Sequence, residues 1–288
     1  MPIDSPIVNV IFPNELQGNG IISRPDIPFT WSDYKCHYLA EGDSWFSMSD
    51  ILSPSFLYRL GNHVPLKQST LIVNCAYPGD TLKKMVDWTA NLNFFKLLHD
   101  EKFGWEWDGI LLSAGGNDVI DAALSPAGIL KECANPASYL DFIDGSAMNV
   151  LKDHLKTFFQ YLVNVRDTSE FVKNRSIPIY YHTYGHMTPR SAPASFGIGP
   201  WLYTALTQKN IPVQYWQPVA DTIIDELGGL LRSFTTLSAN LKLVDTLANA
   251  ALTPASPDST GSSGDWLNEI HLNNSGKDKL ATYWATFL

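Results

Sequence analysis

From residue 35 onward, short apolar runs alternate with longer stretches in which apolar positions recur at helical spacing. Such alternation is typical of a parallel sheet whose strands are connected by helices. The expected strands are 37–40, 70–76, 109–114, 177–183 and 241–245, and the expected helices are 54–60, 81–98, 148–172, 219–237 and 275–288. The pattern predicts an α/β fold, a three-layer α/β/α sandwich around a five-stranded, mainly parallel sheet.

Three segments lie outside this alternation. Residues 1–34 are rich in Pro, Asn and Gly and lack periodicity, which predicts an irregular N-terminal arm before a single domain at 35–288. Residues 185–212, rich in Pro and Gly, predict a long loop insert between the fourth strand and its helix. Residues 253–264 predict a flexible loop. Loops that follow strand ends shape the ligand crevice of an open sheet, so the insert is expected near a site.

Composition and charge exclude several classes of protein. Of the 288 residues, 45% are hydrophobic and 12% aromatic, which is typical of a packed globular core. The 20 Lys and Arg against 29 Asp and Glu give a net charge of -9, which argues against nucleic acid as a partner. No run approaches the ~20 apolar residues of a membrane span.

Signals for compartment are weak in this chain. No basic residue precedes Arg24, so no signal peptide is evident. The three cysteines, Cys36, Cys75 and Cys133, are odd in number and lie in apolar surroundings, which favours buried free thiols over a disulfide framework. We therefore expect a soluble, cytoplasmic protein, while export by another route or after removal of a signal stays open. Oligomeric state is not predicted.

Small and polar residues cluster where the expected strands end. Gly42-Asp43-Ser44-Trp45 follows the first strand, Gly79-Asp80-Thr81 the second and Gly115-Gly116-Asn117-Asp118 the third, and Asn268-Glu269-Ile270-His271 precedes the last helix. Because the carboxyl ends of parallel strands meet at one edge of the sheet, these four blocks are expected to share a site. Nucleophilic acyl transfer requires a serine hydroxyl, a histidine base close to it and a set of N–H donors for the oxyanion.

The four blocks resemble, in kind and order, those of the SGNH hydrolases, the GDSL-type esterase and lipase superfamily, whose blocks are GDS, a Gly, GxND and DxxH. The resemblance spans residues 42–271, nearly the whole domain, and implies the flavodoxin-like SGNH fold. It also implies a cofactor-free serine hydrolase that cleaves a small-molecule ester through an acyl-enzyme on Ser44, with His271 as general base. The backbone N–H groups of Ser44 and Gly79 and the side-chain amide of Asn117 would then bind the oxyanion.

One position departs from the family pattern. Asn268 stands where the DxxH block has its aspartate, and a neutral amide cannot stabilise an imidazolium by charge. Three alternatives are open for the group that orients His271: Asp265 folding back, Asn268 itself, or a backbone carbonyl. The missing aspartate also motivates an alternative function, a non-catalytic ligand-binding module on the same fold.

Other residues have competing interpretations. Asn117 could simply cap a helix. His182 and His186 have the i, i+4 spacing of a helical metal site, but they follow a strand pattern, so no metal site is expected. The absence of a GxxxxGK[ST] loop argues against a nucleotide binder.

The substrate does not follow from the blocks, since pocket shape determines it. A small-acyl or carbohydrate ester is favoured, because no long apolar lid helix is apparent; a long-chain lipase or thioesterase is the alternative. The pocket is expected to include the following residues: Asp43, Trp45, Phe46, His182, Tyr184, Trp201 and Trp266.

Overall fold

The computed structural model describes residues 7–50, 53–60, 64 and 66–288. Its central sheet has six strands in the order β1-β5-β2-β6-β7-β8, and every neighbouring pair is parallel. The strands are β1 (Val8–Ile11), β2 (Cys36–Gly42), β5 (Thr70–Asn74), β6 (Gly109–Ser113), β7 (Ile179–His182) and β8 (Leu241–Val244). A separate antiparallel pair is formed by β3 (Met48–Asp50) and β4 (Ser53–Pro54).

The two strands that flank β2 are buried at every position. Both β5 and β6 consist largely of apolar residues because helices cover a doubly wound sheet on its two faces. Leaving β1 aside, the order β5-β2-β6-β7-β8 is the flavodoxin-like order, in which the chain changes direction between the first and third strands. That switch point lies between β2 and β6, and ligands of open α/β sheets bind in the crevice there.

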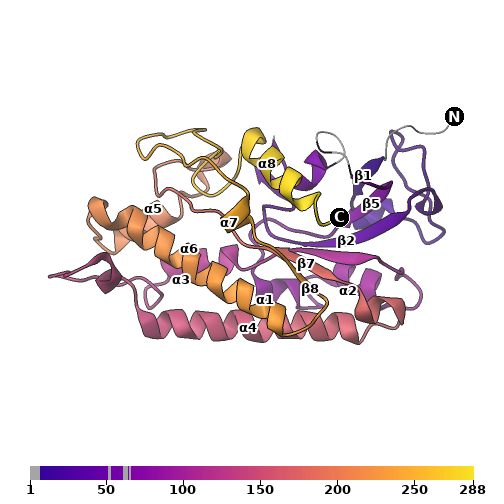
Figure 1. Cartoon of the computed structure of the whole chain (residues 1–288), viewed down its shortest axis with the longest axis horizontal. Helices are drawn as coiled ribbons and strands as arrows, with labels where there is room; N and C mark the ends of the chain where they lie inside the picture. The colour runs from indigo at the N-terminus through magenta and orange to yellow at the C-terminus, as the bar shows by residue number, and fades with distance from the viewer. Residues whose placement is uncertain (1–6, 51–52, 61–63, 65) are drawn as a thin grey trace.

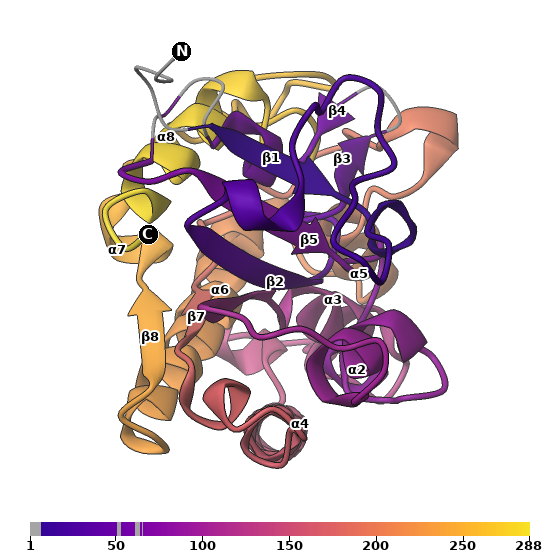
Figure 2. The ribbon, with the colours of Figure 1, turned by 90° about the vertical axis from the view of Figure 1, so that its right-hand side faces the viewer.

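Helices form the two outer layers (Figure 1). The structure has α1 (Leu82–Met85), α2 (Leu92–His99), α3 (Gly116–Leu124), α4 (Gly145–Asp167), α5 (Leu202–Gln208), α6 (Trp216–Ser233), α7 (Thr246–Asn249) and α8 (Asn274–Trp284). Figure 1 shows α4 and α6 along one side of the sheet and α8 on the other, and Figure 2 shows β1 and β8 at opposite edges of the sheet. The long α4 is amphipathic, with Leu151, Leu155, Phe159 and Leu162 buried along one face.

The predicted α/β class and layers are confirmed, but the predicted number of strands is wrong by one. The sixth strand, β1, comes from the segment expected to be irregular and pairs with the edge of β5. The expected helix at 81–98 is two helices, because the Asp87 side chain accepts the N–H of Thr89 and turns the chain. Residues 54–60 form a 3-10 turn at Phe56–Arg59, and the insert contains α5.

The structure also bears on the state of the three cysteines and on the presence of a membrane-spanning helix. Cys36, Cys75 and Cys133 are free, as expected, but they are half-buried where burial was expected. Within the described part of the chain, no helix is both long and apolar enough to cross a membrane.

Candidate active site

Ser44 lies on a tight turn at the carboxyl end of β2. The carbonyl of Asp43 accepts the N–H groups of Phe46 (3.1 Å) and Ser47 (3.0 Å), and the Asp43 carboxylate accepts the N–H of Trp45 (2.9 Å). These bonds close the turn on Asp43 and leave the Ser44 side chain to project from it. The position is next to the switch point between β2 and β6.

The Ser44 hydroxyl contacts a histidine from the opposite end of the sequence. Its Oγ lies 2.8 Å from Nε2 of His271, and both residues are buried, with 8% and 6% of their surface exposed. The indole N–H of Trp45 donates to the carbonyl of Ile270 at 3.2 Å, so the neighbours of the two residues are also joined. The structure therefore forms a Ser–His pair from the first and last of the four blocks.

Asn268 contacts the other ring nitrogen of His271. Its Oδ1 accepts the backbone N–H groups of His271 (2.9 Å) and Ile270 (3.1 Å), which fixes the orientation of the amide. Its Nδ2 then lies 3.0 Å from Nδ1 of His271 and donates to it. A neutral imidazole that accepts at Nδ1 carries its proton on Nε2. Asn268 thus orients the ring but favours the tautomer that donates to Ser44.

Asp265 is engaged elsewhere. Its buried carboxylate accepts from Lys279 Nζ (2.6 Å), Ser275 Oγ (2.7 Å) and the N–H of Thr253 (2.6 Å). Burial alone would raise the pKa of Asp265, but the bonds from Lys279, Thr253 and Ser275 outweigh it and lower that pKa. Of the three alternatives for orienting His271, the structure brings Asn268 to Nδ1. Asp265 instead connects the segment at Thr253 to α8 through its bonds with Ser275 and Lys279.

The second and third blocks meet beside the Ser44 turn. Residues 77–80 form a turn in which Gly79 has φ +80°, a conformation that glycine adopts without strain. The N–H of Tyr77 donates to the carbonyl of Gly42 at 2.9 Å, and Nδ2 of Asn117 donates to the carbonyl of Asp80 at 2.9 Å. An amide nitrogen has two N–H groups, so Asn117 retains one for another acceptor.

A second Ser–His contact lies deeper in the protein, and the sequence interpretation missed it. Ser113, the last residue of β6, has its Oγ 2.9 Å from Nε2 of His182 and 2.8 Å from Oδ1 of Asp43. Nδ1 of His182 bonds the carbonyl of Thr183 at 2.8 Å. Burial lowers the pKa of His182 to about 4 and raises the pKa of Asp43 to about 6. The available signal was a serine at the end of the strand that leads into the third block.

The expected pocket residues divide into two groups. Most of them are buried at or near the Ser44 turn, namely Asp43, Trp45, Phe46, His182, Tyr184 and Trp266. These aromatic rings pack on one another and support the turn; Trp45, for example, stacks on His182 with centroids 5.5 Å apart. Trp201 is partly exposed and lies edge-on to His271, with ring centroids 5.5 Å apart.

The two histidines considered for a metal have separate partners. His186 is exposed and lies 2.9 Å from Asp225, whereas His182 is buried against Ser113. Among the residues that the structure describes, no group of three or more His, Cys, Asp or Glu side chains is arranged to hold a metal ion.

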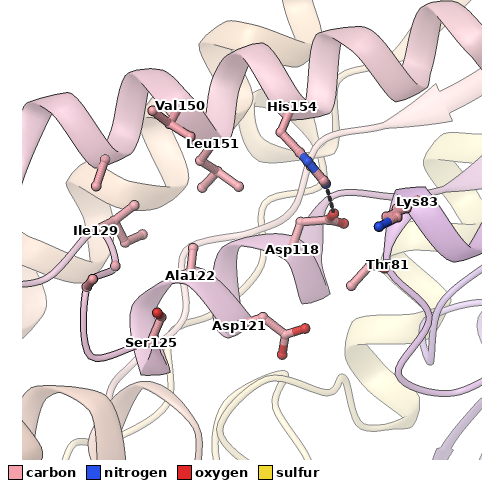
Figure 3. Close-up of a pocket in the computed structure, with 13 residues that line it drawn as sticks. Thr81, Lys83, Asp118, Asp121, Ala122, Ser125, Ile129, Val150, Leu151 and His154 are labelled. Atoms are coloured by element: carbon pink, nitrogen blue, oxygen red, sulfur yellow. Dashed lines mark ion pairs between the residues drawn. The ribbon is translucent and has the colours of Figure 1, made fainter.

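A cavity of about 490 Å³ lies between α3 and α4 (Figure 3). One end carries Thr81, Lys83, Asp118 and His154, and the ion pair of His154 with Asp118 spans 3.6 Å. Thr81 is the last residue of the second block and Asp118 the last of the third, so these two blocks contribute to this end of the cavity. The apolar wall consists of Ala122, Ile129, Ala147, Val150 and Leu151.

Comparison with known proteins places the fold. The lipase Lip_vut3 from a goat rumen metagenome has a similar structure, with a TM-score of 0.52, 13% identity, and coverage of 88% of this chain and 97% of that one. This is the fold of the SGNH hydrolases. Phospholipase A1 from Streptomyces albidoflavus NA297 also has a similar structure, with a TM-score of 0.50, 13% identity, and coverage of 87% of this chain and 98% of that one. No family model and no curated protein sequence matches the chain.

Proposed function

We propose that this SGNH-fold protein is a serine hydrolase of carboxylic esters, with Ser44 as nucleophile and His271 as general base. The observation that carries the proposal is the 2.8 Å contact between Ser44 Oγ and His271 Nε2 at the switch point of the sheet. The structural resemblance to a lipase and a phospholipase supports the class of reaction. The contact of Asn117 with the Asp80 carbonyl, which brings the third block to the second, supports the oxyanion site.

The geometry suits a two-step acyl transfer. His271, once its Nε2 is free of a proton, takes the hydroxyl proton of Ser44 as the oxygen attacks the acyl carbonyl. The backbone N–H groups of Ser44 and Gly79 and the amide of Asn117 stabilise the oxyanion of the tetrahedral intermediate. His271 then protonates the departing alkoxide, which leaves an acyl-enzyme, and a water activated by the same ring hydrolyses it.

A fluorophosphonate probe tests the nucleophile directly. Such probes phosphonylate an activated serine, and peptide mapping by mass spectrometry then locates the label. We expect the label on Ser44. A label on Ser113 would transfer the role to the buried Ser113–His182–Asp43 network, which also joins a serine, a histidine and an aspartate. An unlabelled, folded protein would favour a non-catalytic binding module on this fold.

Asn117→Ala is expected to lower kcat by ~10²–10³, the usual effect of removing one oxyanion donor. KM should change little, because the donor acts on charge that develops in the transition state. Steady-state hydrolysis of p-nitrophenyl acetate measures both quantities. A fall in the melting temperature would reveal how much the lost bond to the Asp80 carbonyl contributes structurally. Unchanged kcat in a folded variant would remove Asn117 from the oxyanion site.

For the substrate, we propose an ester with a small acyl group, such as an acetylated carbohydrate. The near-complete burial of Ser44 and His271 supports this choice, because it leaves little surface at the nucleophile for a bulky acyl chain. The cavity between α3 and α4 favours a second candidate, a long-chain ester, since its apolar wall could accept an alkyl tail.

Chain length separates these two candidates. We expect kcat/KM for p-nitrophenyl acetate to exceed that for the octanoate, and Ala122→Trp, which fills the cavity, to leave the acetate rate unchanged. Preference for octanoate that disappears in Ala122→Trp would establish the second candidate instead.

A further inference from the structure

Glu269 is a fully buried acid that the proposed mechanism does not use. Its Oε2 accepts the N–H of Trp201 and that of Leu202 (3.0 Å). Its Oε1 accepts the N–H of Tyr203 (2.7 Å) and that of Arg190 (3.3 Å). Four backbone donors, all from the insert at 185–212, thus converge on one carboxylate located two residues before His271.

Arg190 completes the connection from the insert side. Its guanidinium donates to the carbonyl of Asn268 at 2.7 Å and to that of Ser259 at 2.8 Å. The N–H of Glu269 in turn donates to the carbonyl of Ala192 at 3.0 Å. Because the bonds run in both directions and lie in the protein interior, they hold the insert rigidly against the loop that carries His271.

The bonds between the insert and Glu269 place Trp201 next to His271. Its indole ring meets the His271 ring edge-to-face, with an interplanar angle of 89°. The indole also lies against the backbone of Gly199, where an added Cβ would come within 2.7 Å of the ring. These contacts with His271 and Gly199 hold the ring in place, and Trp201 stays partly exposed.

We propose that Glu269 is a positioning residue that holds Trp201 as the wall of the subsite for the alcohol part of the ester. This inference rests on the proposed function. His271 must protonate the departing alkoxide, so the alcohol leaves from the side of the imidazole. The oxyanion donors come from the segments of Gly79 and Asn117, whereas Trp201 borders the imidazole. An indole face suits an aromatic alcohol or a sugar ring.

Two esters with one acyl group isolate this subsite. Methyl acetate and benzyl acetate give the same acetyl-enzyme, so they differ only in the steps up to and including loss of the alcohol. We expect Trp201→Ala to lower the benzyl-to-methyl ratio of kcat/KM about tenfold, as expected for loss of one hydrophobic contact. Hydrolysis of the common acetyl-enzyme, followed after a burst with p-nitrophenyl acetate, should keep its rate. Trp201→Phe should restore part of the ratio, and Trp88→Ala, at a residue 63% exposed, is the matched control.

Glu269→Gln tests the positioning role. Its amide loses two of the acceptor positions at the insert N–H groups, so the ratio should fall in the same direction as in Trp201→Ala. The double variant Trp201→Ala/Glu269→Gln should show no further fall, because both changes act through one ring. An equal loss of activity on both esters, or an unchanged ratio in Trp201→Ala, would overturn the proposal. Failure of the fluorophosphonate to label Ser44 in the unaltered protein would instead refute the proposed function.

Discussion

Ser44→Ala is expected to lower kcat for p-nitrophenyl acetate by about 10⁴-fold or more, because the acyl-enzyme cannot form without the hydroxyl. Covalent labelling by a fluorophosphonate should disappear at the same time. Ser113→Ala, its matched control, removes a second serine that contacts a histidine and is expected to retain most of the activity. Both variants should be assayed beside the parent chain, with circular dichroism to confirm folding.

The two serines differ in what surrounds them. Ser113 has no exposed surface, and its single proton faces two acceptors, Asp43 and His182. The second nitrogen of His182 bonds a backbone carbonyl, not a carboxylate. We therefore expect Ser113→Ala to act mainly on stability, at a cost of about 1–3 kcal/mol for the polar groups left unpaired. If Ser113→Ala abolished turnover and Ser44→Ala did not, the deeper network would be the catalytic one.

The sheet could be predicted from the sequence because the strands on either side of β2 are buried at every position. β5 and β6 are nearly continuous apolar runs, and such runs can be recognised in the sequence without knowledge of the tertiary structure. β1 could not be predicted in this way. Its four residues include the polar Asn9, and only the pairing with the edge of β5 makes the segment a strand. The break between α1 and α2 likewise depends on one side-chain bond, from Asp87 to Thr89.

The site was predictable as far as strand topology determines it. Parallel strands bring their carboxyl ends together, so Ser44, Gly79 and Asn117 could be assigned to one edge. The partner of His271 could not be assigned, because Asp265 and Asn268 are both close in sequence and only the folded loop shows that Lys279 engages Asp265. The Ser113–His182 contact depends on the register of β6 and β7, in which Leu112 lies opposite Tyr181.

Asn268 favours a tautomer of His271 that cannot take the Ser44 proton, and one substitution can reverse this preference. As the amide is held, Nδ2 donates to His271 Nδ1, which favours the tautomer with its proton on Nε2. General-base catalysis needs the opposite tautomer, in which Nδ1–H would face another N–H. In serine proteases the change of the triad aspartate to asparagine lowers turnover ~10⁴-fold for this reason. A carboxylate at 268 could accept the two backbone N–H groups with one oxygen and Nδ1–H with the other.

Asn268→Asp is therefore expected to raise kcat, by about 10²-fold or more, through the correct tautomer and stabilisation of the imidazolium. Because a nearby carboxylate favours the charged ring, the acidic limb of the pH–rate profile should also move to higher pH. Steady-state kinetics from pH 5 to 9 measures both effects. Asp265→Asn is the matched control; it loses a bond to Lys279 and should lower the melting temperature without raising kcat. Equal or lower kcat in a folded Asn268→Asp variant would mean that His271 does not act as the base for Ser44.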